Sequence, residues 1–149
     1  MQIKTKIIND NSNNVIDVVI DNDKSNTEQD FENFSNIWKQ FYLDKKYFIF
    51  KIDTSNLTNA SIYYCYKMAM LIKSFKNSSE QYLKYSIMTI PSNIIRNLLN
   101  LIMKIEKPVA TIYVTKNILE SDSLYKYKLD NSVLLESFIL INNINVIES

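Results

Sequence analysis

The sequence predicts an α/β fold in which amphipathic helices cover a mixed, mostly parallel sheet of four or five strands. Three observations support this prediction. Residues 47–52, YFIFKI, form a β-branched and aromatic run typical of a strand buried on both faces. Polar turns separate such runs from segments with helical periodicity. Near the N-terminus, two short apolar segments flank the polar turn NDNSNN, which is the pattern of a hairpin.

The stretch 47–75 is the part of the chain around which we expect the fold to be organised. The strand 47–52 precedes a polar turn, 53–59, and the segment 61–75 has helical periodicity. Cys65, Met68, Ile72 and Phe75 share one face of that helix. The turn should lie at the carboxyl edge of the parallel sheet, where ligands and partners usually meet α/β domains.

The other elements follow the same alternation. We predict strands at residues 2–8, 15–21, 85–90 and 110–114, and helices at residues 27–43 and 93–106. Thr27 and Asp30 resemble a capping box at the start of the first helix. The apolar stripe of that helix consists of Phe31, Phe34, Ile37, Trp38 and Phe41, and that of the helix 93–106 consists of Ile94, Ile95, Leu98, Leu99, Ile102 and Ile105. The order β-β-α-β-α-β-α-β predicts right-handed crossovers, with helices on one or both faces of the sheet.

We predict two parts of the chain, a domain that covers residues 1–116 and a C-terminal extension, residues 117–149. Residues 117–129 are compatible with a short helix, and residues 133–141 are apolar enough for a helix or a strand. These apolar side chains require cover. We expect them to pack on the domain or on a partner.

Composition excludes several classes of function. The net charge of +1 does not predict binding to nucleic acid or to an anionic membrane. No apolar run is long enough to span a bilayer, and the N-terminal residues lack the hydrophobic core of a signal peptide. Since there is only one cysteine, we expect a cytoplasmic protein, with association to a virion or another assembly as the alternative. Asn should take the left-handed turn positions, because the chain has no glycine.

Catalysis is not expected. Glycine-dependent phosphate loops and nucleophile elbows are absent, and so is histidine, the commonest general base and metal ligand. Cys65 lies on the inward face of its helix, which is typical of a structural thiol. The acidic stretch 17–23 lacks the spacing of a calcium loop. We therefore predict no cofactor and no metal.

The order of elements and two local motifs resemble the STAS domain (sulfate transporter and anti-sigma-factor antagonist), which has the SpoIIAA-like fold. The first motif is IDTSNLTNASIYY, residues 52–64, which looks like the strand, Asp-x-Ser turn and helix of the family. The second is IMTIPSNIIRNLLNLIMKIEKPVATIYV, residues 87–114, which is similar to the strand, Ser-Pro-like turn, helix and closing strand. The resemblance covers about residues 1–116.

The turn departs from the pattern of anti-sigma-factor antagonists, which carry Asp-Ser-Ser-Gly with a phosphorylated serine. Aligned from Asp53, these positions are Ser61, Ile62, Tyr63 and Tyr64. Ile62 and Tyr63 thus occupy the two serine positions. The resemblance therefore implies a related module without the usual phosphorylatable serine.

The expected function is that of a non-catalytic protein–protein interaction module that binds a protein partner or a second copy of itself. Its predicted surface surrounds the turn and the exposed side of the following helix: Ser55, Thr58, Ser61, Tyr63, Lys67 and Met70. Asp53 and Ser55 are interpreted as turn formers. Two alternatives remain, a structural or assembly protein and a small hydrophobic ligand-binding domain.

Overall fold

The computed structural model describes residues 1–10, 12–23, 26–130 and 135–149. The strands are β1 (Gln2–Asp10), β2 (Asn13–Asp21), β3 (Phe48–Asp53), β4 (Leu83–Thr89), β5 (Ile112–Thr115) and β6 (Asn145–Ile147). The helices are α1 (Thr27–Leu43), α2 (Ile62–Lys76), α3 (Asn93–Ile105), α4 (Ile118–Asp130) and α5 (Leu135–Asn142). Residues 133 and 134, the start of the apolar tail segment, lie outside the described residues.

The strands form one sheet in the order of the sequence, from β1 at one edge to β6 at the other. The strands β2 to β5 are parallel, while β1 and β6 pair antiparallel with their neighbours. The predicted α/β fold, with its N-terminal hairpin and mixed, mostly parallel sheet, is confirmed. The sheet has six strands instead of four or five, because three residues near the C-terminus add β6 to the edge at β5.

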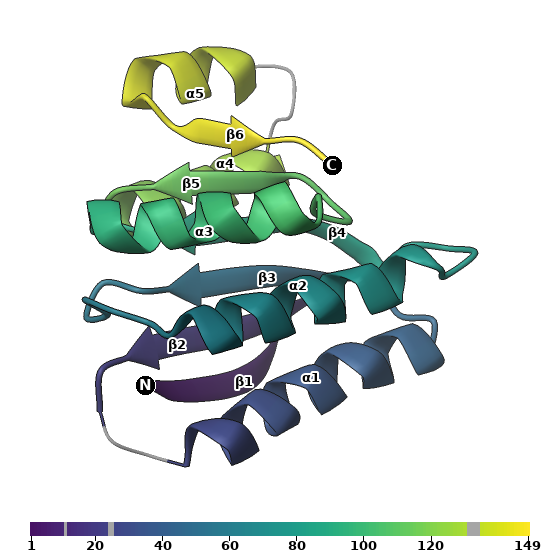
Figure 1. Cartoon of the computed structure of the whole chain (residues 1–149). Coiled ribbons are helices and arrows are strands. Elements are labelled where there is room, and N and C mark those ends of the chain that lie inside the picture. Colours follow the sequence, from purple (N-terminus) through teal and green to yellow (C-terminus); the bar gives the residue numbers. More distant parts are fainter. Residues whose placement is uncertain (11, 24–25, 131–134) are drawn as a thin grey trace.

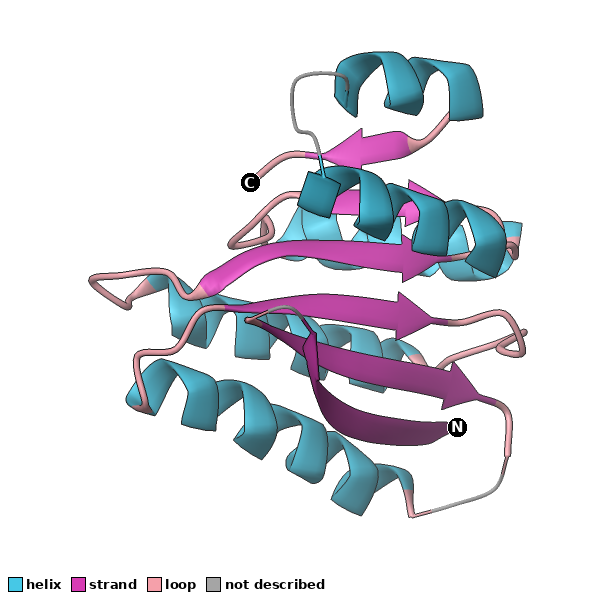
Figure 2. Ribbon diagram, turned by 180° about the vertical axis from the view of Figure 1, so that it is seen from behind, coloured by secondary structure: helices cyan, strands magenta, loops and turns pink. Residues whose placement is uncertain are grey.

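The three crossover helices, α1, α2 and α3, lie on the same face of the sheet (Figure 1). Each crossover is expected to be right-handed, and each successive parallel strand is added on the same side of the previous one. Together these conditions place all three helices on one face. The helix α4 follows β5 on the opposite face, as the view from behind shows (Figure 2).

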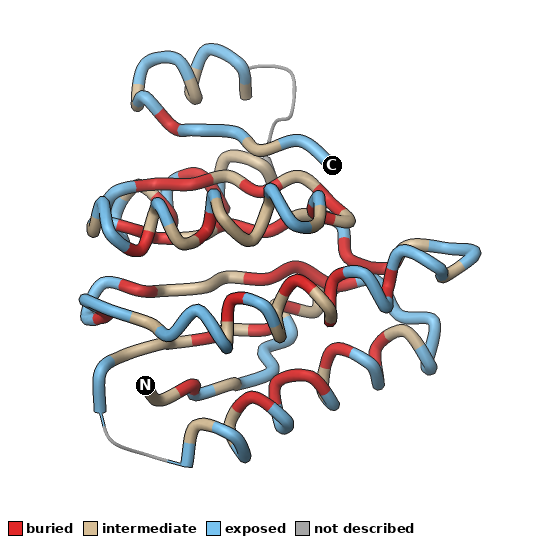
Figure 3. Tube along the Cα trace, in the orientation of Figure 1, coloured by how far each residue is buried: buried red, intermediate tan, exposed pale blue. Residues whose placement is uncertain are grey.

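A cluster of large aromatic side chains forms the core between the sheet and the helices α1 and α2. The indole of Trp38 stacks on Phe75 with ring centroids 4.3 Å apart and meets Phe50 edge to face at 5.0 Å. Figure 3 shows that buried segments alternate with exposed ones along both helices, which is the periodicity of an amphipathic helix. The residues Phe31, Phe34, Trp38 and Phe41 are buried as predicted, and so are Cys65, Ile72 and Phe75.

The C-terminal extension packs on the other face of the sheet. Leu124 and Tyr125 of α4 cover Val15, Ile49 and Ile87. Phe138 and Ile139 of α5 pack against the same cluster together with Ile144. The helices α4 and α5 thereby cover part of this face of the sheet.

Three local predictions are wrong. Tyr47, predicted as the first residue of the strand buried on both faces, lies before β3 and is 51% exposed. The N-cap of α1 is Asn26, whose side chain accepts a bond from the Gln29 backbone N–H, and not Thr27. Asp30 instead accepts a bond from the backbone N–H of Ile3, so it ties α1 to the edge strand. In α3, Ile94 and Ile105 are 59% and 43% exposed because they lie at the flank of the apolar stripe, about a quarter turn of the helix away from the buried Ile95 and Leu99.

A left-handed backbone occurs at Ser12, Lys45 and Asn143 among the described residues. Only one of these is the expected asparagine. The N–H groups of Lys45 and Lys46 bond the carbonyls of Tyr42 and Phe41, which is a Schellman motif with lysine in the place of glycine. This chain therefore ends α1 in the usual way without the residue that normally allows it.

Candidate functional site

The predicted interaction surface begins at the turn between β3 and α2, which is held by its own side chains. The carboxylate of Asp53 accepts bonds from the backbone N–H of Ser55, at 2.9 Å, and from its hydroxyl. Thr58 exchanges two bonds with Asn22, which follows β2: its hydroxyl accepts from the amide nitrogen at 2.9 Å, and its N–H donates to the amide oxygen at 3.1 Å. Two loops at the carboxyl edge are thus tied together.

The helix α2 starts at Ser61, whose hydroxyl accepts a bond from the N–H of Tyr64. Beyond this cap, Ile62, Tyr63 and Tyr66 are 69%, 56% and 54% exposed. Met70 is half-buried further along the helix. The first two turns of α2 therefore present one aliphatic and two aromatic side chains to solvent.

Lys67 does not point freely into solvent as its place in the predicted surface requires. Its ammonium group bonds the Glu28 carboxylate of α1 at 2.9 Å. It also lies 4.9 Å from the ring centroid of Phe31 and within 6 Å of the rings of Tyr63 and Tyr64. The hydrogen bond to Lys67 and its charge lower the pKa of Glu28. Lys67 thus connects α2 to α1.

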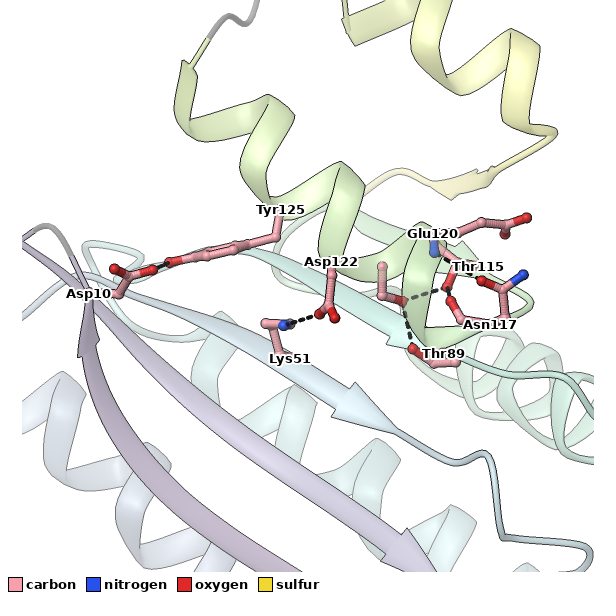
Figure 4. A network of polar contacts seen from close by, with 9 residues as sticks. Asp10, Lys51, Thr89, Thr115, Asn117, Glu120, Asp122 and Tyr125 are labelled. Carbon is pink, nitrogen blue, oxygen red and sulfur yellow. Dashed lines mark hydrogen bonds and ion pairs between the residues drawn. The ribbon is translucent and has the colours of Figure 1, made fainter.

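A second polar group lies at the carboxyl ends of β4 and β5, where the chain leaves toward opposite faces of the sheet. Such a position is the usual ligand crevice of an open α/β sheet. Here the buried hydroxyls of Thr89, Ser121 and Thr115 fill it. Ser121 lies 2.6 Å from Thr89 and 2.5 Å from Thr115, and Thr115 donates to the carbonyl of Asn117 (Figure 4). When Thr89 donates to Ser121 and Ser121 donates to Thr115, each of the three hydroxyls donates one hydrogen bond. This cluster therefore fixes the position of α4 on the sheet.

Two contacts between residues far apart in the sequence hold the rest of α4 over the hairpin and β3. Lys51 of β3 pairs with Asp122 at 2.7 Å, and the Tyr125 hydroxyl donates to Asp10 of β1 at 3.0 Å (Figure 4). Burial and then the Asp10 carboxylate raise the pKa of Tyr125 to about 12. The tyrosine therefore remains a hydrogen-bond donor throughout the physiological pH range.

The described side chains offer little for nucleophilic or metal chemistry. Burial raises the pKa of the Cys65 thiol, which keeps it in its neutral and less reactive form. Within the ranges that the structure describes, no three Cys, Asp or Glu side chains are grouped so that they could hold a metal ion. Within the same ranges, no helix is both long and apolar enough to cross a membrane.

Two of the three basic side chains on α2 are paired with acidic ones. Besides the pair of Lys67 and Glu28, Lys76 bonds Glu106 at the C-terminal end of α3 at 2.7 Å. These contacts neutralise charge that a nucleic-acid surface would need.

The sequence reasoning missed Ile62 and Tyr66, the exposed residues at the start of α2. A signal existed for Tyr66 only: it directly follows Cys65, which faces the core together with Ala69 and Ile72, and so turns away from the sheet. Ile62 has the spacing of the buried stripe, three residues before Cys65 and seven before Ala69, so periodicity gave no signal for its exposure. Ser121 was missed as well. Its role depends on two threonines from strands distant in the sequence, which no local pattern reveals.

Comparison with known proteins finds no match to this chain among family models, curated proteins or solved structures. The resemblance to STAS domains therefore rests on the order of the elements and on the two motifs in the turn regions.

Proposed function

We propose that this protein is a non-catalytic protein–protein interaction module of the STAS-like type, and that the outer face of α2 binds the partner. One observation carries the proposal: Ile62, Tyr63 and Tyr66 stand side by side on the first two turns of α2, and each is more than half exposed. Aromatic side chains are enriched in protein interfaces. The hydrogen-bonded turn before α2 keeps this face in place without a partner.

The hairpin followed by alternating helices and strands supports the STAS-like part of the proposal. The phosphorylation switch is expected to be absent, because Ile62 and Tyr63 stand where the family has serines. Ser61 and Thr58 are the hydroxyl residues nearest to the start of the helix, and both already accept hydrogen bonds. Phosphopeptide analysis of protein purified from its own organism tests this point. Stoichiometric phosphate on either residue would contradict it.

Site-specific photo-crosslinking in the native organism tests the interface directly. A photoreactive amino acid replaces Tyr66 in one variant and Leu119, which is exposed on α4, in a matched control. We expect one discrete cross-linked protein, or a second copy of the chain, from position 66 and none from position 119. Equal products from both positions, or none from position 66, would refute the interface.

Assembly through the C-terminal region is a second candidate function, and it rests on a different observation. In α5, Leu140 and Ile141 are 76% and 78% exposed, so this helix presents an apolar surface of its own. Native mass spectrometry of the wild type and of the variant Leu140→Ser with Ile141→Ser separates the two functions. Oligomers that dissociate in this variant would favour assembly through α5, whereas a monomer in both cases, or an oligomer that the variant leaves intact, favours the interaction module.

A further inference from the structure

An apolar cavity of about 150 Å³ lies between the sheet and the helices α1, α2 and α3. Side chains from all three helices and from the inner strands line it, among them Phe34, Trp38, Phe50, Ile72, Leu99 and Ile112. The lining includes no Lys, Arg, Asp or Glu among the described residues. Core packing is normally dense enough to leave few voids larger than a water molecule, so this space is unusual for a domain of this size.

Of the polar groups in the residues that line the cavity, the buried indole N–H of Trp38 has no hydrogen-bond partner among the described residues, and it would offer a water molecule a single partner. The Thr54 hydroxyl donates to the Thr89 carbonyl at 2.7 Å, and burial raises the pKa of the Cys65 thiol, which therefore carries no charge. A water molecule in a cavity needs two to four polar partners, whereas apolar cavities of this size stay dry.

We propose that this cavity is a binding site for a small, neutral, apolar molecule about the size of a single aromatic ring. An engineered apolar cavity of about 150 Å³ in another protein binds benzene or xenon. Pockets for drug-sized ligands are larger, about 300–1,000 Å³, so a fatty acid or another lipid does not fit without expansion of the core. The site lies on the inner side of α2, whereas the proposed interaction surface lies on its outer side, so the two proposals stand independently.

Trp38 is a built-in reporter, because it lines the cavity and is the only tryptophan of the chain. Titration with iodobenzene, a heavy-atom quencher, should quench its fluorescence saturably, and benzene should reverse the quenching by competition. Linear quenching that benzene does not reverse, as for a tryptophan in free solution, would overturn the proposal. Competition by hexadecanoate as effective as that by benzene would overturn the size limit.

A cavity-filling variant gives the second measurement. Ala110 is buried and lines the cavity, so Ala110→Leu should weaken iodobenzene binding by about tenfold or more because its side chain occupies the ligand volume. Its melting temperature should stay equal to that of the wild type or rise, whereas an added side chain in a filled core lowers it. Leu119→Ala, on the exposed surface of α4, is the control and should bind as the wild type does. Unchanged binding by Ala110→Leu, or a large loss of its stability, would refute the site.

Discussion

The two faces of the sheet are closed in different ways. On one face, three crossover helices pack on the sheet through two clusters of aromatic and aliphatic side chains, and a cavity of about 150 Å³ remains between them and the sheet. On the other face, α4 and α5 cover part of the sheet, and α4 is positioned by buried hydroxyls, an ion pair and a tyrosine–carboxylate bond. The first face depends mainly on apolar burial, which tolerates imperfect packing. The second depends on specific polar partners.

The largest effects are expected from residues of β3 that point to opposite faces. Phe48 packs on Phe41 on the face of the crossover helices, and Phe48→Ala should lower the free energy of unfolding by about 3–5 kcal/mol. Ile49 is buried under α4, and Ile49→Ala should cost about 2–5 kcal/mol. Urea unfolding measures both. A cost below about 1 kcal/mol for Ile49→Ala would show that α4 does not cover this face.

Removal of one hydroxyl from the second face should have a smaller effect. Ser121→Ala leaves Thr89 and Thr115 without their buried partner and should cost about 1–3 kcal/mol. Ser123→Ala, an exposed position of the same helix, is the matched control and should change stability by less than about 0.5 kcal/mol. Equal effects of the two variants in urea unfolding would mean that the hydroxyl cluster does not position α4.

The ion pair between Glu28 of α1 and Lys67 of α2 should stabilise the folded protein in a defined pH range. The pKa of Glu28 is lowered from 4.5 by Lys67, so its contribution is present above pH 4.5 and is lost as the pH falls through the folded value. The pKa of Lys67 is raised from 10.5 mainly by the bond to Glu28, so its contribution is lost as the pH rises through the folded value.

Glu28→Gln should therefore destabilise the protein between pH 4.5 and 10.5 and should approach the wild type in stronger acid. Melting temperatures recorded across this range measure the difference. Glu32→Gln, an exposed position on the same helix, should show no such window. If the melting temperatures of Glu28→Gln and the wild type differ by the same amount at all pH values, the ion pair is not the cause of the difference.

The smallest change in stability is expected on the outer face of α2. Ile62 and Tyr66 are exposed, so Ile62→Ser together with Tyr66→Ser should alter the free energy of unfolding by about 0.5 kcal/mol or less per site. Urea unfolding checks this. A loss comparable to that of Phe48→Ala would mean that these side chains belong to the core.

Local periodicity was sufficient to predict most of the first face. The spacing of Phe31, Phe34, Trp38 and Phe41 predicted the buried side of α1, and the run 47–52 predicted the internal strand β3. The second face could not be predicted in the same way, because α4 has a weak apolar stripe and is positioned by partners far away in the sequence. The place of Lys67 was misjudged for a similar reason, since its partner Glu28 lies on another helix.

The most direct test of the proposed function is the affinity of the cross-linked partner for the Ile62→Ser, Tyr66→Ser variant, measured by titration calorimetry against the wild type. The interaction surface predicts a loss of affinity of about tenfold or more, since truncation of exposed aromatic anchors at an interface commonly costs more than 1 kcal/mol. The Leu140→Ser, Ile141→Ser variant should bind as tightly as the wild type does. Unchanged affinity of the α2 variant, with both proteins folded, would contradict the proposal that this face of α2 binds the partner.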